Sequence, residues 1–170
     1  MARLAGARLL SLRRAAPWVV LVALANCAHR ELPPCSASSL SPPVAERAAV
    51  ELINRHRRAA SLPPLEWNSD LAALARAHSR DLAADGGKLS HRGFRGRFER
   101  AAAKAPTQRF GENITQTCGG TSKAAQTAVA NWLDSTPHRR NIEGDFRRTG
   151  VGVARDERGW VVFTQLLAAP

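Results

Sequence analysis

The chain has 170 residues, which is room for one domain and a targeting segment but little more. Hydrophobic residues make up 44% of the chain and aromatic residues only 5%, so alanine and leucine must fill much of the core. The formal net charge of +11 favours anionic partners, and without a helix-turn-helix, RNA-binding or oligonucleotide-binding barrel motif the sequence argues against nucleic acid.

Residues 1–26 are typical of a signal peptide. Four arginines and no acid occur in the first 25 residues, and an apolar run extends from Ala15 to Ala25. Eleven residues are too few to span a bilayer as a helix, which needs about 20. A basic region followed by a short apolar region and small residues is instead the pattern of export. Without these arginines the chain still holds 21 basic against 14 acidic residues, so the mature part stays positive.

Two processing routes compete at the end of this segment. The run Ala23-Leu24-Ala25 fits ordinary cleavage before Asn26. The run Leu24-Ala25-Asn26-Cys27 resembles a bacterial lipobox, in which the cysteine becomes the lipidated first residue, although Asn26 replaces the usual small residue. We favour the lipoprotein route, which predicts lipidation of Cys27 and a position in the bacterial cell envelope, anchored to a membrane.

The cysteine count supports this choice. The chain has three cysteines, Cys27, Cys35 and Cys118, and an odd thiol is a liability in an oxidising compartment. If Cys27 carries lipid, Cys35 and Cys118 remain as an even pair, for which we expect a disulfide. Residues 27–43 are rich in proline and serine, as expected for a tether between the anchor and the domain.

Helices dominate the first part of the predicted domain, which spans residues 44–170. Helical spacing of apolar residues predicts helices over residues 44–60 and from Asn68 or Ser69 to Gly86, and a basic, partly helical stretch covers 94–105. The inward stripes are Ala45, Ala48, Ala49, Leu52, His56 and Ala59 in the first helix and Leu71, Leu74, Ala75, His78 and Leu82 in the second. His56 and His78 on these stripes are expected to be hydrogen-bonded core histidines.

Strands enter in the second part of the domain. A short strand is expected at residues 112–117 and a third helix at 122–134. A hairpin should close the chain, with one strand around residues 151–153, a turn at 156–159 and a second strand at 160–167. Helices interleaved with a few strands indicate an α+β fold.

Four segments in order resemble the bacterial branch of the CAP superfamily, which comprises cysteine-rich secretory, antigen-five and pathogenesis-related proteins and is also called the SCP domain. The segments are LINRHRRAASLPPLEWN (52–68), LAALARAHSRDLA (71–83), SHRGFRGR with FGENIT, and NWLDSTPHRRNI followed by FRRTGVGVA. The resemblance implies a three-layer α-β-α sandwich with a mainly antiparallel central sheet. It also implies a cleft that bears histidines and acids.

The resemblance places the cleft residues one by one. His91 matches the histidine after the second helix, Glu112 matches the glutamate of the Gly-Glu-Asn motif, and His138 matches the second histidine. Ser135 stands where animal and fungal relatives carry a second glutamate, so the set of four is incomplete. Two imidazoles and one carboxylate have the composition of an open zinc site. They can also act as a base and its orienting group. We therefore expect His91, Glu112 and His138 to hold zinc or another divalent cation, with Ser135 as a further ligand-binding residue.

Three functions remain open. The first is a non-enzymatic binding module for a small ligand, a lipid or an envelope polymer. The second is a hydrolase in which Glu112 and a histidine activate water, although the sequence has no GxSxG or HExxH motif. The third is a surface protein-interaction module. We rank them in this order, and a bound ion or ligand would separate the first two.

Overall fold

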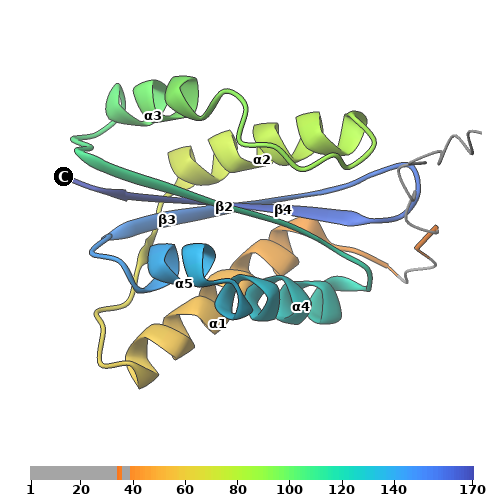
Figure 1. Ribbon diagram of the computed structural model, residues 1–170, viewed down its shortest axis with the longest axis horizontal. Helices are drawn as coiled ribbons and strands as arrows, with labels where there is room; N and C mark the ends of the chain where they lie inside the picture. The colour runs from red at the N-terminus through yellow and green to blue at the C-terminus, as the bar shows by residue number, and fades with distance from the viewer. Residues whose placement is uncertain (1–33, 36–38) are drawn as a thin grey trace, which may run out of the picture. The chain divides into compact units, whose positions relative to one another are not determined.

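The computed structural model describes residues 34–35 and 39–170 (Figure 1). The expected signal peptide, the lipidation site at Cys27 and most of the expected tether lie outside the described residues. The described elements are α1 (Pro42–Ala59), β1 (Glu66–Trp67), α2 (Ser69–Ala84), α3 (Phe94–Ala102), β2 (Arg109–Thr117), α4 (Thr121–Asp134), α5 (Thr136–Glu143), β3 (Arg148–Arg155) and β4 (Val161–Ala169).

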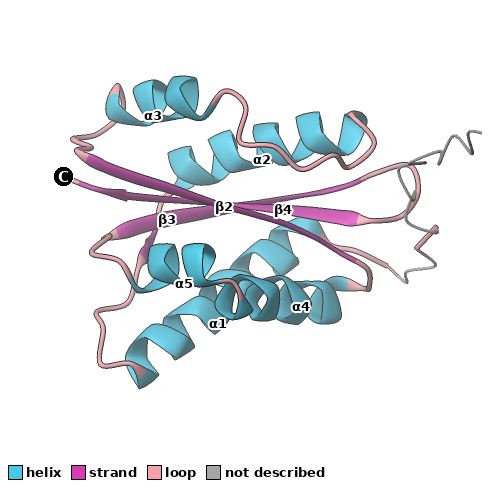
Figure 2. Ribbon diagram, viewed as in Figure 1, coloured by secondary structure: helices cyan, strands magenta, loops and turns pink. Residues whose placement is uncertain are grey.

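Three layers make up the domain, as expected (Figures 1 and 2). The central sheet has the strand order β1-β3-β4-β2, with α2 and α3 on one face and α1, α4 and α5 on the other. Strand β4 is antiparallel to both of its neighbours, β2 and β3, while the two-residue β1 is parallel to β3. The sheet is therefore mixed, and its long strands are antiparallel. The C-terminal hairpin of β3 and β4 also confirms the sequence prediction.

The larger core lies between the sheet and the layer of α1, α4 and α5. Trp132 of α4 is fully buried and contacts Phe163 of β4 edge to face, with the ring centroids 6.5 Å apart. Small side chains of α1 and α4 bring the two helices close together; the buried alanines are Ala45, Ala49, Ala124, Ala125 and Ala128. The low aromatic content thus corresponds to a core built from alanine and branched aliphatic residues.

Two glycines of β3 explain the Thr-Gly-Val-Gly-Val motif. A Cβ atom at Gly150 would lie 2.1 Å from the backbone nitrogen of Ala72, and one at Gly152 would lie 2.1 Å from that of Arg76. A Cβ atom essentially never approaches a non-bonded atom this closely, so only glycine lets the backbone of α2 rest directly on the sheet. Val151 and Val153, which alternate with the two glycines, point to the opposite face and enter the larger core.

The buried face of α1 differs from the predicted stripe. Glu46, Val50, Ile53 and Arg57 are buried, whereas His56 is half-buried and bonds Glu143 (2.9 Å). The expectation of a core histidine at His56 is therefore wrong. Ala45 and Ala49 of the predicted stripe are buried and Ala48 and Leu52 pack against the core, whereas Ala59 is exposed. Helical periodicity did not predict burial of Glu46 and Arg57, because it cannot show that a charged side chain has a buried partner.

Glu46 and Arg57, the two buried charged residues of α1, lie near opposite ends of the helix and bond to different parts of the domain. Glu46 accepts from Arg76 of α2 (2.6 Å to Oε2) and from the backbone N–H of Val153 on β3 (3.3 Å). Arg57 donates to the carbonyls of Pro63 (2.7 Å) and Ile142 (2.5 Å), and burial lowers its pKa. These bonds connect α1 with the sheet at one end and with the loops at the other.

Cys35 and Cys118 form the expected disulfide, which closes a span of 83 residues. Cys35 is buried, and its N–H donates to the carbonyl of Arg158 (2.8 Å), so this part of the predicted tether lies against the domain. In the described part of the chain, no helix is long and apolar enough to cross a membrane.

Candidate functional site

The Gly-Glu-Asn motif lies on β2, an edge strand, and its side chains alternate between the two faces of the sheet. A Cβ atom at Gly111 would lie 3.1 Å from the ring of Phe146, so glycine leaves room for the segment after α5. Asn113 donates to the carbonyl of His138 on α5 (3.1 Å). Glu112 points to the opposite face, toward the α3 layer. The motif therefore joins two layers at one edge of the sheet.

Two asparagines hold α5 against this edge. Asn141 donates to the carbonyl of Glu112 (3.2 Å) and to the side-chain oxygen of Asn113 (2.8 Å). Asn113 in turn donates to the side-chain oxygen of Gln165 on β4 (2.9 Å), in the buried interior. This network fixes the position of α5 and with it His138. Helix α5 is not among the elements expected from the sequence, and its Pro137 lies in the first turn, where proline is compatible with a helix.

Arg97 of α3 forms a bidentate ion pair with the carboxylate of Glu112. Its Nε atom donates to Oε2 (2.5 Å) and its Nη2 atom to Oε1 (2.7 Å). The side chains are only 4% and 1% exposed, respectively. A buried charge needs a paired and hydrogen-bonded partner, and here the pairing uses both carboxylate oxygens. Arg97 also donates to the carbonyl of Arg92 (2.9 Å), which fixes the turn before α3.

His91 completes the surroundings of this carboxylate. Its Nδ1 atom lies 2.8 Å from Oε1 of Glu112. A carboxylate can only accept, so Nδ1 carries the hydrogen and the other ring nitrogen, Nε2, remains available. The side chain is 58% exposed, so Nε2 is accessible from solvent. Glu112 therefore orients His91.

His78 lies behind this group, on α2. Its Nε2 atom is 2.9 Å from the carbonyl of Ser90, and its Nδ1 atom is 3.3 Å from Nη1 of Arg97. One tautomer satisfies both contacts: Nε2–H donates to the carbonyl, and Nδ1 accepts from the guanidinium. Burial lowers the pKa of His78, and repulsion from Arg97 lowers it further. The expectation of a hydrogen-bonded core histidine is confirmed here.

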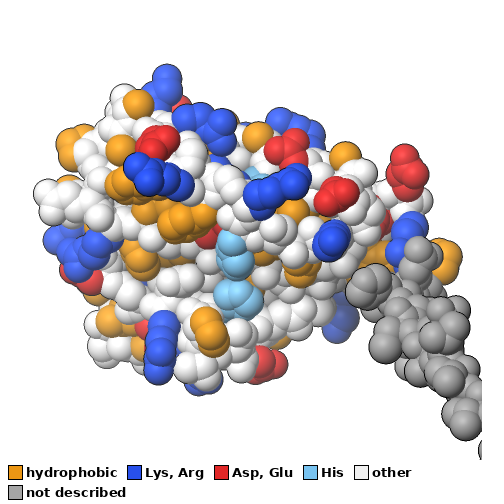
Figure 3. Space-filling model, turned by 45° about the horizontal axis from the view of Figure 1, so that its top comes forward, with side chains coloured by type: hydrophobic (Ala, Val, Ile, Leu, Met, Phe, Trp, Pro, Cys, Tyr) orange, Lys and Arg blue, Asp and Glu red, His pale blue; other side chains and the backbone are white. Residues whose placement is uncertain are grey.

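His138 comes to the same place from the other layer. Two histidine side chains lie next to each other in the middle of the face shown in Figure 3. The pKa of the half-buried His138 is lowered, first by loss of solvent and then by the charge of His91, which shows that the two rings influence each other. Both effects favour the neutral form of His138. We refer to His91, Glu112, His138 and Arg97 as the histidine site.

Ser135 is less closely connected. It is the residue before α5, and its carbonyl accepts from the N–H of Arg139 (2.8 Å). Its side chain makes no capping bond to α5, and no hydrogen bond joins it to the other expected site residues. The structure thus brings together three of the four residues expected from the sequence.

The donor set does not fit a three-ligand zinc site. Within residues 34–35 and 39–170, no group of three or more histidine, cysteine or acidic side chains is arranged to hold a metal ion. The reason is the position of Glu112, whose oxygens accept from Arg97 and His91. In many zinc sites a carboxylate of this kind orients a ligating histidine without touching the metal. Two imidazoles remain as candidate ligands.

A cavity of about 350 Å³ adjoins the network, and Arg97 and His78 form part of its wall. Its other charged lining residues are Lys88, Arg92, Arg100, Asp81 and Asp85. His91, Glu112 and His138 do not line this cavity, so the histidine site is open at the surface beside it.

Arg97 is the main site residue that was not predicted from the sequence. It lies in a strongly arginine-rich stretch, where an arginine is usually solvated. The sequence held one indication that Arg97 is buried. Arg97 and Ala101 are four residues apart, so they share one face of a helix, and this face is the buried side of α3.

Comparison with known proteins decides the family. The sequence profile of the CAP, cysteine-rich secretory protein family matches residues 50–167. The chain belongs to this family. It is 29% identical over 119 residues to the uncharacterized protein YkwD of Bacillus subtilis (strain 168), covering 68% of this chain and 44% of that protein.

Two solved structures have a similar fold. An extracellular protein with an SCP domain from Bacillus anthracis str. Ames is 28% identical, with a TM-score of 0.64 over 76% of this chain and 41% of its own. An outer surface protein of Borrelia burgdorferi is 17% identical, with a TM-score of 0.61 over 72% of this chain and 90% of its own, and shares the fold. This CAP chain spans less than half the length of the two Bacillus relatives.

Proposed function

We propose that this CAP domain is an exported, non-enzymatic binding module whose ligand is an anionic envelope polymer held at the histidine site and the adjoining cavity. The observation that carries this proposal is the state of Glu112. A general base must be able to take a proton from water, whereas both oxygens of this buried carboxylate are engaged by Arg97. The geometry thus argues against Glu112 as the general base of a hydrolase.

The chemistry around the site favours an anionic, hydroxyl-bearing ligand. A neutral imidazole can donate one hydrogen bond and accept another, which suits hydroxyl groups. Beside the histidines, the cavity wall carries Lys88, Arg92 and Arg100, whose charges suit phosphate or carboxylate groups. Asp81 and Asp85 on the same wall are suited to cationic substituents of such a polymer. A small ligand or a lipid headgroup would use the same groups.

Binding to isolated polymers tests this function. Poly(glycerol phosphate) and peptidoglycan fragments are titrated into the protein by calorimetry. We expect binding to weaken at least tenfold in His91→Ala and His138→Ala. His56→Ala is the matched control, since His56 is a partly exposed histidine that bonds Glu143 outside the site. Equal binding by all three variants would refute the site, and release of shorter fragments from a polymer would establish a hydrolase.

Export and anchoring are part of the same proposal. The Cys35–Cys118 disulfide supports an oxidising compartment. It also uses two of the three cysteines, which leaves Cys27 for the predicted lipid. Growth of cells with a palmitate analogue should label the parent protein and leave Cys27→Ser unlabelled. Equal labelling, or a mature N-terminus at Asn26 in mass spectrometry, would exclude the lipoprotein route.

A further inference from the structure

Apolar and basic side chains are exposed together on the loop before α3 and on α3 itself. Among the described residues, the large hydrophobic side chains that are most exposed are Val44, Leu89 and Phe94, and two of these three lie in this segment. Leu89 is 44% and Phe94 is 36% exposed. Phe94 and Phe98 both contact Phe110 of β2, with ring centroids 5.3 and 5.8 Å apart. Two exposed hydrophobic side chains in one short segment make this segment a candidate contact surface.

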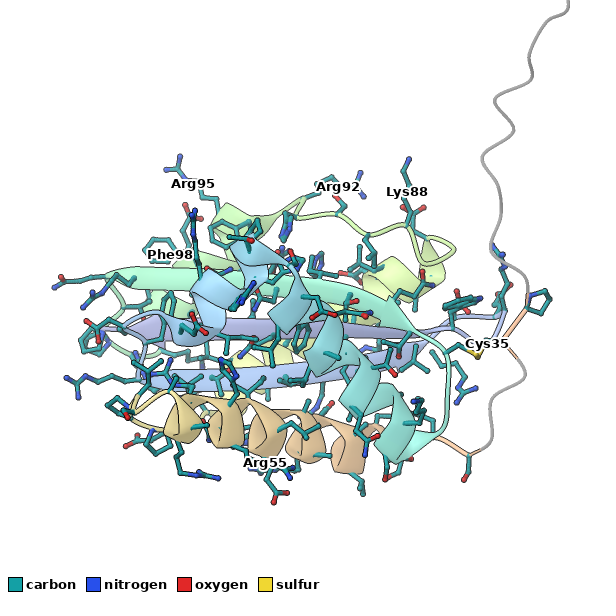
Figure 4. The ribbon with its side chains drawn as sticks, turned by 60° about the horizontal axis from the view of Figure 1, so that its bottom comes forward. Cys35, Arg55, Lys88, Arg92, Arg95 and Phe98 are labelled. Carbon is teal, nitrogen blue, oxygen red and sulfur yellow. A yellow bond between two sulfur atoms is a disulfide. The ribbon has the colours of Figure 1, made fainter. Side chains whose placement is uncertain are left out.

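The same segment is strongly basic. Residues 88–100 contain Lys88, Arg92, Arg95, Arg97 and Arg100 but only one acid, Glu99. Arg97 is neutralised by Glu112, and Arg95 bonds Glu99 (3.0 Å) at the surface. Figure 4 shows the side chains of Lys88, Arg92 and Arg95 projecting from one edge of the domain, opposite to Arg55 on α1.

We propose that this surface, formed by Leu89, Phe94, Lys88, Arg92 and Arg95, docks on the headgroup layer of an anionic lipid bilayer. The exposed parts of Leu89 and Phe94 gain free energy at the hydrocarbon boundary, and the cationic side chains of the same segment are complementary to anionic headgroups. A hydrophilic polymer matches the charges but offers nothing for the apolar side chains. The docking goes beyond ligand binding at the histidine site and is independent of a lipid on Cys27.

Quenching by lipid measures the contact directly. Phe94→Trp is made in the full-length chain with Trp18→Phe, so that the new signal does not come from the N-terminal residues. The protein is mixed with brominated vesicles of phosphatidylglycerol and phosphatidylcholine, or of phosphatidylcholine alone. We expect quenching, relative to the same chain with Phe94, only with the anionic vesicles. Absence of quenching, or equal quenching by both kinds of vesicle, would overturn the proposal.

Charge reversal provides the second arm. Lys88→Glu/Arg92→Glu should weaken partitioning to the anionic vesicles at least about 25-fold, since each basic residue near such a surface contributes about fivefold. Arg55→Glu/Arg58→Glu changes the net charge equally on exposed positions of α1 and should have much less effect. Equal losses in the two double variants would indicate unspecific attraction and contradict the docking surface.

A third arm separates docking from the proposed function. His91→Ala/His138→Ala should leave vesicle binding unchanged while it weakens polymer binding. If vesicles do not quench the indole introduced by Phe94→Trp but poly(glycerol phosphate) binding depends on Lys88 and Arg92, the surface is a polymer site and the lipid proposal is wrong.

Discussion

The guanidinium group of Arg97 and the carboxylate of Glu112 form a two-pronged ion pair in which both side chains are almost fully buried. Arg97 lies on α3 and Glu112 on β2, so the pair fastens an outer helix to an edge strand. His91 and His78 both bond to this pair, one on each partner. The orientation of the exposed histidine thus depends on a buried contact.

Removing either partner should be costly. Glu112→Gln leaves the buried guanidinium uncompensated, and we expect it to lower the free energy of unfolding by about 3–5 kcal/mol. Arg97→Met should have a similar effect, whereas Arg97→Met/Glu112→Gln should recover much of the loss because neither charge remains. Urea denaturation of the four proteins gives the coupling free energy. Strictly additive losses would contradict the pair. Arg95→Ala, which breaks an exposed pair on the same helix, should leave the midpoint almost unchanged.

Substitution of alanine for Gly152 should show that this glycine is required for the close packing of α2 on β3. Gly152→Ala places a methyl group where the backbone of α2 lies, so we expect a loss of at least about 1–3 kcal/mol in the free energy of unfolding. Gly96→Ala is the matched control, because its Cβ meets nothing within 4 Å inside α3. Alanine favours helix there and should stabilise the protein by about 0.5–1 kcal/mol. Equal effects at the two sites would refute the close approach of α2.

The pH dependence of stability follows from His78 and His138. Folding lowers the pKa of both rings below their ordinary value of 6.5, so the unfolded chain takes up protons first as the pH falls. The contribution of these two rings to the free energy of unfolding is fully present above about pH 6.5. It is lost as the pH falls through their lowered pKa values in the folded state. Each ring contributes a slope of at most about 1.4 kcal/mol per pH unit.

Thermal unfolding between pH 8 and pH 5 measures this slope. His138→Gln should reduce the loss of stability below pH 6.5 and leave the curve above pH 7.5 flat. An unchanged slope in this variant would show that His138 does not titrate as described.

Periodicity and motifs predicted most of the fold. The helices α1, α2 and α4 and the final hairpin begin and end within a few residues of the expected positions, because each has clear spacing and clear breaks. The paired charges were not predictable in this way. Glu46 and Arg76 are 30 residues apart, and Arg97 and Glu112 are 15 apart, so only the packing of different elements makes them partners. Resemblance to the family located His91, Glu112 and His138. It did not reveal that Arg97 forms a buried ion pair with the carboxylate of Glu112.

Zinc binding distinguishes a ligating role of Glu112 from an orienting one. With Glu112 engaged by Arg97, only the imidazoles of His91 and His138 remain, and two ligands hold zinc far more weakly than the three of an open catalytic site. We therefore expect calorimetric titration of zinc into the chelated protein at pH 7.5 to show weak binding, reduced further in His91→Ala and again as the pH falls through about 6.5. Copper or nickel contamination is excluded by prior treatment with chelator. Tight binding that is lost in His91→Ala, His138→Ala and Glu112→Gln alike would contradict this expectation. In that case the metal must displace Arg97 from the carboxylate, and the three residues form the zinc site expected from the sequence.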